Sequence, residues 1–119
     1  MEPEELLKKA EQFFIAEDYD SAMEAYNYGI NNLCPNYAPI WNNRAAVQLK
    51  LGNYYEVIND TSKALQLLDP PVEANAMMRV KAFMRRGTYF QWLVKRKTWP
   101  FGQFALSYGY FQNVNGLSQ

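Results

Sequence analysis

AEQFFIAEDYDSAMEAYNYGI occupies residues 10–30, and AAVQLKLGNYYEVINDTSKAL, at residues 45–65, repeats its pattern. The two copies match at corresponding positions, including Ala10 with Ala45, Tyr19 with Tyr54 and Ile30 with Leu65. Each copy contains two stretches of apolar residues at helical spacing, separated by a tight turn. A repeat of 35 residues with this pattern predicts helical hairpins that stack and bury their apolar faces against one another.

Proline residues set the expected helix boundaries. Pro39 suits the first turn of a helix, whereas Pro70 and Pro71 separate a fourth helix from a fifth. The helices are expected near residues 4–16, 19–33, 38–51, 54–69 and 72–92. The predicted fold class is therefore all-α. Antiparallel helix pairs are expected to form a short right-handed superhelix of two complete repeats plus the first helix of a third.

The composition excludes several classes of function. The chain has 119 residues, 49% of them hydrophobic, so it can form one domain with a real core. It contains no histidine and a single cysteine, Cys34, which argues against a zinc site and against the commonest acid–base catalysis. The sequence also lacks a glycine-rich phosphate-binding loop. We therefore expect neither an enzyme nor a bound metal or cofactor.

Charge is balanced overall but unevenly distributed along the chain. The formal net charge is zero, yet residues 1–36 hold eight acidic and two basic side chains. Beyond Glu73 the chain has no acidic residue, and residues 79–97 hold seven basic ones. This asymmetry predicts a basic surface at one end of the stack, although a neutral molecule is not expected to bind nucleic acid. A membrane span is not expected, because no apolar run approaches about 18 residues.

The second repeat carries the most specific signal. NNRAAVQLKLGNYYEVINDTSKALQL, residues 42–67, resembles the repeat of tetratricopeptide-repeat (TPR) domains of the co-chaperone type. A third copy opens at residues 82–88, AFMRRGT, where Gly87 takes the small position of Ala45. The extra stretch PPVEANAM, residues 70–77, is followed by a basic helix. In these features the chain is similar to the TPR region of the dyslexia-susceptibility family of axonemal dynein assembly factors.

The resemblance implies a TPR domain over residues 1–92, followed by a divergent aromatic tail at residues 93–119. Within the domain, repeat 1 is expected at about residues 3–36, repeat 2 at about 38–71 and the third helix at about 72–92. Residues 104–110 of the tail alternate as in a strand, but the same aromatic residues also fit a short helix. The tail is expected to cover the exposed side of the third repeat's helix, and an interaction surface is the alternative.

For TPR domains that bind chaperones, the resemblance implies a carboxylate clamp on the first helix of each repeat. Lysine, arginine and asparagine supply the donors that a desolvated carboxylate needs. Three matching positions are Asn43, Lys81 and Arg85. Leu7 and Glu11 depart from the pattern, because they stand where the family has lysine and asparagine. Lys8, next to Leu7, is a candidate replacement for the missing lysine.

Two functions are compatible with these observations. The first is a co-chaperone that binds the acidic C-terminal tail of Hsp90 or Hsp70 through a partial clamp, during cytoplasmic preassembly of axonemal dynein. The second is a TPR scaffold that binds dynein assembly factors or dynein chains without the clamp. In that case Lys81 and Arg85, four residues apart, form only a solvated face. The resemblance implies a cytoplasmic location, with nuclear or ciliary-base association as alternatives. The open C-terminal end of the repeats is a candidate homodimer surface.

Overall fold

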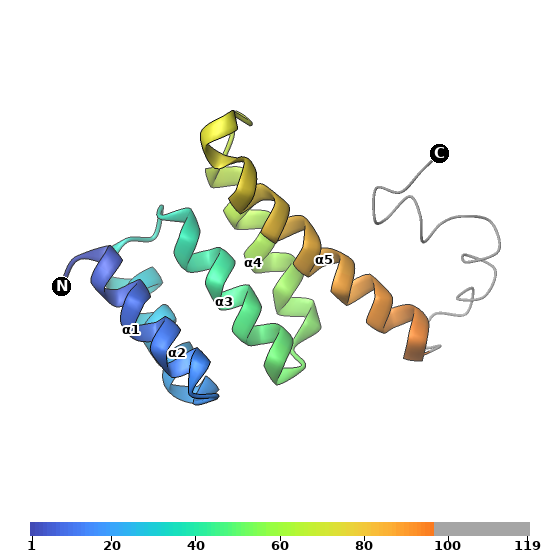
Figure 1. Ribbon diagram of the computed structural model, residues 1–119, viewed down its shortest axis with the longest axis horizontal. Coiled ribbons are helices and arrows are strands. Elements are labelled where there is room, and N and C mark those ends of the chain that lie inside the picture. The colour runs from blue at the N-terminus through green and yellow to red at the C-terminus, as the bar shows by residue number, and fades with distance from the viewer. Residues whose placement is uncertain (97–119) are drawn as a thin grey trace.

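The computed structural model describes residues 1–96, which form five α-helices and contain no strand (Figure 1). The α-helices are α1 (Pro3–Ile15), α2 (Tyr19–Tyr28), α3 (Ala38–Leu51), α4 (Tyr54–Leu67) and α5 (Ala76–Arg96). A π-helical turn, η1 (Gly29–Leu33), extends α2, and a 3-10 turn, η2 (Glu73–Asn75), precedes α5. The all-α prediction is confirmed for this part of the chain. The expectations for the tail beyond residue 96 lie outside the described residues.

The helices pack as antiparallel pairs in two layers. α1 pairs with α2 and α3 pairs with α4, while α5 packs on both α3 and α4. α3 also contacts α1 and α2, so it joins the first pair to the rest of the stack. In Figure 1, α2 lies behind α1, and α4 lies at the back between α3 and α5. This is the arrangement expected for two TPR hairpins followed by the first helix of a third.

Several helix ends lie where the sequence predicted them. α1 and α3 have proline in their first turn, and the Asp18 side chain accepts a hydrogen bond from the Ser21 N–H at the start of α2. The proline pair at residues 70–71 separates α4 from η2. α5 is longer than expected, because it continues past Trp92 to Arg96. No proline or glycine interrupts residues 88–96, so nothing in this stretch ends the helix.

The core is built from small residues that allow the helices to approach closely. Ala10, Ala22, Ala45 and Ala64, which occupy the repeated small positions, are fully buried. Larger residues fill the space between the pairs, namely Leu6, Tyr26, Ile30, Ile40, Val47 and Val57. At the first turn, Tyr19 packs its ring 5.6 Å from that of Phe14. The matched alanines Ala10 and Ala45 thus lie at corresponding buried positions of the two repeats.

The end of α2 departs from a regular α-helix. The sequence predicted one helix over residues 19–33, but the last turn is π-helical, and the Cys34 N–H donates to the Gly29 carbonyl at 2.7 Å. A Cβ atom on Gly29 would lie 2.5 Å from Leu6 Cδ2 and 2.8 Å from Ile40 Cδ1. Glycine therefore lets the end of the first hairpin contact both α1 and α3 closely.

A single residue, Asn75, organises the insertion between α4 and α5. Its side-chain amide donates to the carbonyls of Leu68 (2.7 Å) and Pro70 (3.2 Å), while its oxygen accepts from Arg79 Nε at 2.6 Å. Arg79 also donates to the Val72 carbonyl at 3.0 Å. The insertion is therefore an ordered connection that fixes where α5 begins.

Apolar side chains remain exposed on one side of α5. They are Met77, Val80, Phe83 and Met84. A second helix of a third repeat would pack on such a surface. No described residue covers these side chains, and homodimerisation through this end stays a prediction.

The tight turns of the two hairpins share an unusual backbone conformation. Gly52 has a φ of 80°, and Glu17, the aligned residue of the first copy, has a φ of 62°. A left-handed φ favours glycine, because a Cβ atom crowds the following carbonyl oxygen. The second turn therefore carries the favoured residue, whereas the first stores strain.

We expect Gly52→Ala to lower the free energy of unfolding by about 1–2 kcal/mol, because only backbone strain is added. No atom lies within 4 Å of the added Cβ, so a steric clash does not contribute. The matched change Glu17→Gly should raise stability by about 0.5–1 kcal/mol. Urea denaturation of the two variants measures both effects. If both substitutions changed the free energy of unfolding in the same direction, this would contradict the argument.

Candidate peptide-binding face

The predicted site residues lie on the layer formed by α1, α3 and α5, in which α3 contacts both of its neighbours. Asn43 lies on α3, Lys81 and Arg85 lie on α5, and Lys8 lies on α1. Asn43 and Arg85 lie close to the same tyrosine, Tyr26, whereas Lys8 lies apart from them on α1.

Arg85 is the most constrained of the predicted residues. Its side chain is half-buried, and its Nη1 donates to the Asn42 carbonyl of α3 at 2.8 Å. Burial lowers the pKa of its guanidinium, whereas the nearby Tyr26 hydroxyl raises it. Within residues 1–96 the one ion pair joins Arg44 to Asp60, so Arg85 has no carboxylate partner there. A half-buried guanidinium without a counter-ion is costly and favours an anionic ligand.

The hydroxyl of Tyr26 lies near the side chains of both Asn43 and Arg85. The ring of Tyr26 is buried in the core. Burial raises the pKa of Tyr26 to about 12; the Asn43 side chain and the Arg85 charge lower it, and the Glu11 charge raises it. Residues of three other helices thus act on the hydroxyl of Tyr26. We call Glu11, Tyr26, Asn43 and Arg85 the Tyr26 cluster.

Tyr26 was not singled out in the sequence analysis. Its ring packs in the core. Only the position of its hydroxyl beside Asn43 and Arg85 shows a polar function, and that position depends on the tertiary contact of three helices. No local signal in the sequence marks it.

Lys81 lies one helical turn before Arg85 and is exposed. In the described part of the chain its ammonium has no hydrogen-bond or ion-pair partner. Lys81 can therefore add a mobile positive charge beside the fixed guanidinium of Arg85. An exposed lysine contributes less than a half-buried arginine, because solvent screens its charge.

Asn42, the neighbour of Asn43, is a further polar residue that sequence reasoning did not single out. It is almost completely buried, and its Nδ2 donates to the Met78 carbonyl of α5 at 3.1 Å. Together with the Arg85 bond to its carbonyl, this contact fastens α3 to α5. Its Oδ1 is buried and has no partner in the described structure. Asn42 therefore positions the two helices that carry Asn43 and Arg85.

On α1, the side chains of Leu7, Lys8 and Glu11 have different surroundings. Leu7 packs against the core, and Glu11 is exposed but close enough to affect Tyr26. Lys8 is exposed and lines a shallow pocket of about 270 Å³ together with Met1, Glu5, Lys9 and Gln12. No member of the Tyr26 cluster lines that pocket. The structure thus brings Asn43 and Arg85 together, and places Lys8 on a separate part of α1.

Arg44 holds α3 in its orientation. Its guanidinium donates to Asp60 through Nε (2.9 Å) and Nη2 (2.7 Å), and to Asn27 Oδ1 at 2.9 Å. Burial raises the pKa of the Asp60 carboxyl, while Arg44 lowers it. The guanidinium also lies 5.1 Å from the centre of the Trp41 ring. Arg44 is therefore a structural residue, because these contacts tie α3 to α2 and α4.

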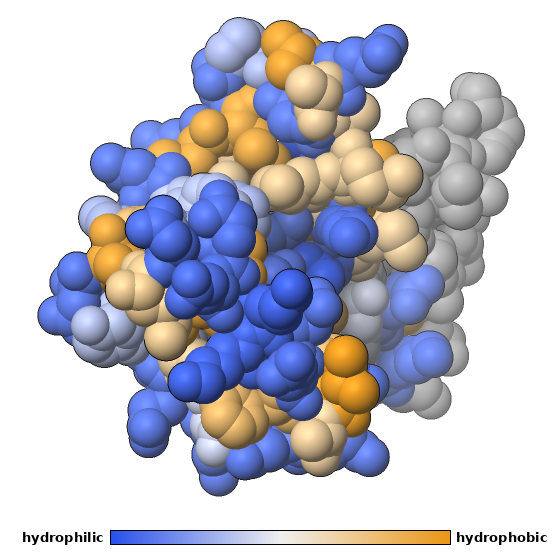
Figure 2. Space-filling view, turned by 60° about the vertical axis from the view of Figure 1, so that its left-hand side comes forward, coloured by the Kyte–Doolittle hydropathy of each residue, from blue (hydrophilic) through white to orange (hydrophobic). Residues whose placement is uncertain are grey.

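The surface at the N-terminal side is predominantly hydrophilic. Figure 2 turns this side toward the viewer and shows hydrophilic residues gathered across its middle, with hydrophobic residues mainly toward the edges. Such a surface offers charges and hydrogen bonds rather than a broad apolar contact. A ligand that binds here must itself be polar or charged.

Comparison with known proteins places the repeats in a family. Dynein axonemal assembly factor 4 of Pongo pygmaeus is 49% identical over 90 residues, which are 74% of this chain and 21% of that protein. Over this stretch the chain is homologous to dynein axonemal assembly factor 4. The Mus musculus assembly factor is 47% identical over 88 residues, again 74% of this chain and 21% of the relative. The resemblance inferred from the repeats is confirmed.

A more distant relative is a protein SGT1 homolog of Oryza sativa subsp. japonica, 31% identical over 106 residues, or 89% of this chain and 26% of that protein. The chain spans about one fifth of the length of dynein axonemal assembly factor 4. No protein-family model and no solved structure matches the chain.

Two further properties bear on function. None of the helices within residues 1–96 is long and apolar enough to span a membrane. The same residues contain no group of three or more histidine, cysteine, aspartate or glutamate side chains placed to hold a metal ion.

Proposed function

We propose that this chain is a protein-interaction module of the co-chaperone type that binds an acidic, free C-terminal peptide through Asn43, Lys81 and Arg85. The half-buried guanidinium of Arg85, which has no carboxylate partner among residues 1–96, carries this proposal. A peptide carboxylate would supply the missing negative charge and accept from an arginine that is already held in place. Asn43 adds an amide donor without further like-charge repulsion.

The resemblance to co-chaperone TPR domains supports the C-terminal tail of Hsp90 or Hsp70 as the ligand. The name of the homologous assembly factor supports a role in the assembly of axonemal dynein. In this proposal the module recruits a chaperone to dynein assembly factors or dynein chains in the cytoplasm. It acts by binding and performs no chemical step.

Glu11 opposes the proposed ligand. Its charge acts on the same hydroxyl as Arg85, so a bound carboxylate near Tyr26 would be repelled. We therefore expect weaker binding than a complete clamp gives. Lys8 lines a pocket that contains no member of the Tyr26 cluster, so we do not expect it to replace the missing lysine. This argument also supports the alternative function, a scaffold that binds dynein assembly factors or dynein chains without recognising a chaperone tail.

The test is a titration with a labelled peptide ending in Met-Glu-Glu-Val-Asp, compared with the same peptide carrying an amidated C-terminus. We expect the free-acid peptide to bind and the amidated peptide to bind at least about tenfold more weakly, because a charged hydrogen bond is lost. Lys81→Glu should weaken binding by about tenfold at low salt, and this effect should shrink at high salt.

The matched control is Lys95→Glu, which makes the same charge change on the same helix. Lys95 lies about 21 Å along the axis from Lys81, given the rise per residue of an α-helix. Binding should be nearly unchanged in this variant. Equal affinity for the acid and amide peptides, or no binding by the folded chain, would reject the clamp and favour the scaffold.

A further inference from the structure

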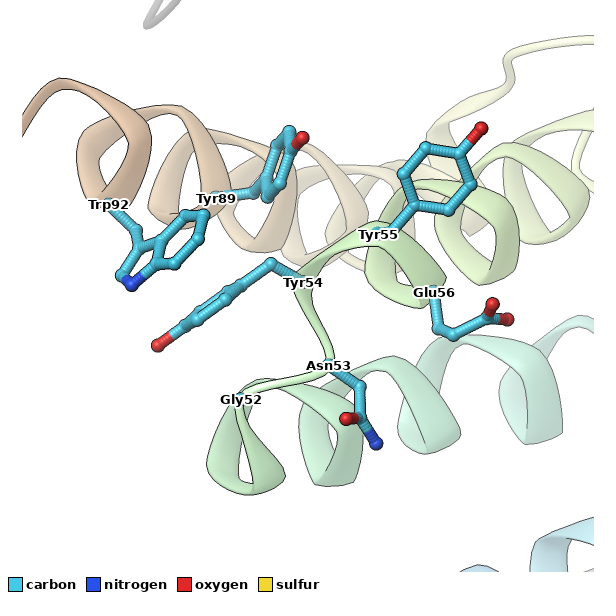
Figure 3. Close-up of a pocket in the computed structure, with 7 residues that line it drawn as sticks. All are labelled: Gly52, Asn53, Tyr54, Tyr55, Glu56, Tyr89 and Trp92. Carbon is cyan, nitrogen blue, oxygen red and sulfur yellow. The ribbon is translucent and has the colours of Figure 1, made fainter. Parts of the chain in front are cut away.

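A second candidate site lies away from the Tyr26 cluster, where the turn between α3 and α4 meets the C-terminal half of α5. Figure 3 shows this pocket, which has a volume of about 350 Å³. Its lining residues are Gly52, Asn53, Tyr54, Tyr55, Glu56, Tyr89 and Trp92. None of the proposed clamp residues belongs to this set. The pocket is therefore independent of the function proposed above.

Aromatic rings make up most of the pocket wall. Tyr54 stacks on Trp92 with ring centroids 4.3 Å apart, and Tyr89 lies 6.2 Å from Trp92 and 6.3 Å from Tyr54. Figure 3 shows Tyr55 on the opposite side of the opening. Tyr55 is 74% exposed, which is unusual for a large aromatic side chain that contributes nothing to the core. The faces of these rings carry partial negative charge and attract cations.

The one ionised side chain in the lining is a carboxylate. Glu56 is exposed, and in the described part of the chain it has no hydrogen-bond or ion-pair partner. The nearest buried acid, Asp60, is already paired with Arg44, so no cation of that network is available to Glu56. Among residues 1–96, no lysine or arginine lines the pocket. Ring faces and an unpaired carboxylate together make the pocket attractive to positive charge.

We propose that this pocket binds the side chain of an arginine from a partner polypeptide. A guanidinium is planar, so it can stack on the exposed ring of Tyr55 while its N–H groups donate to the carboxylate of the neighbouring Glu56. Lysine offers only a compact charge and cannot stack in this way. The volume lies at the low end of ligand pockets, about 300–1,000 Å³, which suits one or two side chains rather than a helix.

The experiment titrates the ¹⁵N-labelled 119-residue chain with the amidated peptide Ac-Gly-Ser-Arg-Ser-Gly-NH₂ and follows the indole N–H signals by NMR. The amidated end excludes carboxylate recognition. We expect the Trp92 signal, assigned by Trp92→Phe, to shift while that of Trp41 stays in place. The same peptide with citrulline, a neutral isostere of arginine, should bind at least about tenfold more weakly. A Gly-Ser-Pro-Ser-Gly peptide tests recognition of proline instead.

Two pairs of surface variants separate the site from general electrostatics. Glu56→Gln should weaken arginine binding by about fivefold to tenfold, whereas Glu24→Gln, which removes an exposed charge on α2, should not. Tyr55→Leu should weaken it by about threefold, and Tyr28→Leu, at another exposed tyrosine, should have no effect.

Circular dichroism checks that each variant remains folded. Equal binding of the citrulline peptide, stronger binding of the proline peptide, equal effects of Glu56→Gln and Glu24→Gln, or an unmoved Trp92 signal would each overturn the proposal.

Discussion

Replacing Arg44 by methionine should lower the free energy of unfolding by about 3–5 kcal/mol. The substitution leaves Asp60, whose side chain is 1% exposed, as a buried carboxylate without its bidentate partner. It also removes the bond to Asn27, so α3 loses its polar contacts with both α2 and α4. Chemical denaturation followed by circular dichroism measures the loss.

The loss caused by Arg44→Met should depend on pH. Burial raises the pKa of Asp60 and Arg44 lowers it, so the variant has the higher folded-state pKa. A carboxyl whose pKa is raised by folding costs stability at high pH, and this cost disappears below its unfolded pKa of about 4. The stability gap between the wild type and the variant should therefore narrow as the pH falls toward 4.

Two controls identify the cause of the Arg44→Met effect. Lys63→Met removes another cation above the Trp41 ring, 5.8 Å from its centre, and should cost no more than about 1 kcal/mol. The double variant Arg44→Met/Asp60→Leu removes both charges and should recover much of the lost stability. A double variant no more stable than Arg44→Met would show that the unpaired charge is not the cause.

Replacing Arg85 by methionine should weaken binding of the free-acid peptide by about 10- to 150-fold, the effect of losing a hydrogen bond to a charged group. The effect should exceed that of Lys81→Glu, because Arg85 is half-buried and already oriented by the Asn42 carbonyl. Fluorescence anisotropy of the labelled peptide measures the affinity. The amidated peptide already lacks the carboxylate, so it should bind Arg85→Met about as weakly as it binds the wild type.

Stability should change much less than affinity in Arg85→Met. The variant removes a half-buried charge that has no carboxylate partner within residues 1–96, and the Asn42 carbonyl keeps its bond within α3. The matched control is Arg86→Met on the same helix, where the guanidinium donates to Ser62 instead. If Arg86→Met weakened binding as much as Arg85→Met, a specific role for Arg85 would be excluded.

The repeat pattern predicted the helices well because the responsible signals are local. Pro39 marks the start of α3, Gly52 ends it, and the alanines of the two copies lie where helices meet. The π-helical turn after Tyr28 was not predicted, because it depends on the close approach of Leu6 and Ile40 to Gly29. Periodicity in one helix carries no information about such a contact.

The candidate site was predictable in part. The resemblance singled out Asn43, Lys81 and Arg85, and the structure brings Asn43 and Arg85 to the same hydroxyl. The sequence did not show that Arg85 is half-buried or that Tyr26 joins the two residues. These properties depend on how α2, α3 and α5 pack, which no single repeat encodes. Whether the three residues bind a carboxylate stays a prediction.

The position of α3 between the two ends of the molecule affects how the protein unfolds locally and how binding at one end affects the other. Among the described helices, α1 and α5 share no contact, and neither do α2 and α4. Fraying of either end can therefore remain local, while loss of α3 separates the molecule into pieces that no longer share a core. Coupling carried by helix packing between the acidic first hairpin and the basic last helix must pass through α3. The electrostatic influence of Arg85 on Tyr26 is a separate link between the two ends. A protein that bound at one end would thus influence the packing at the other only as far as α3 is rigid.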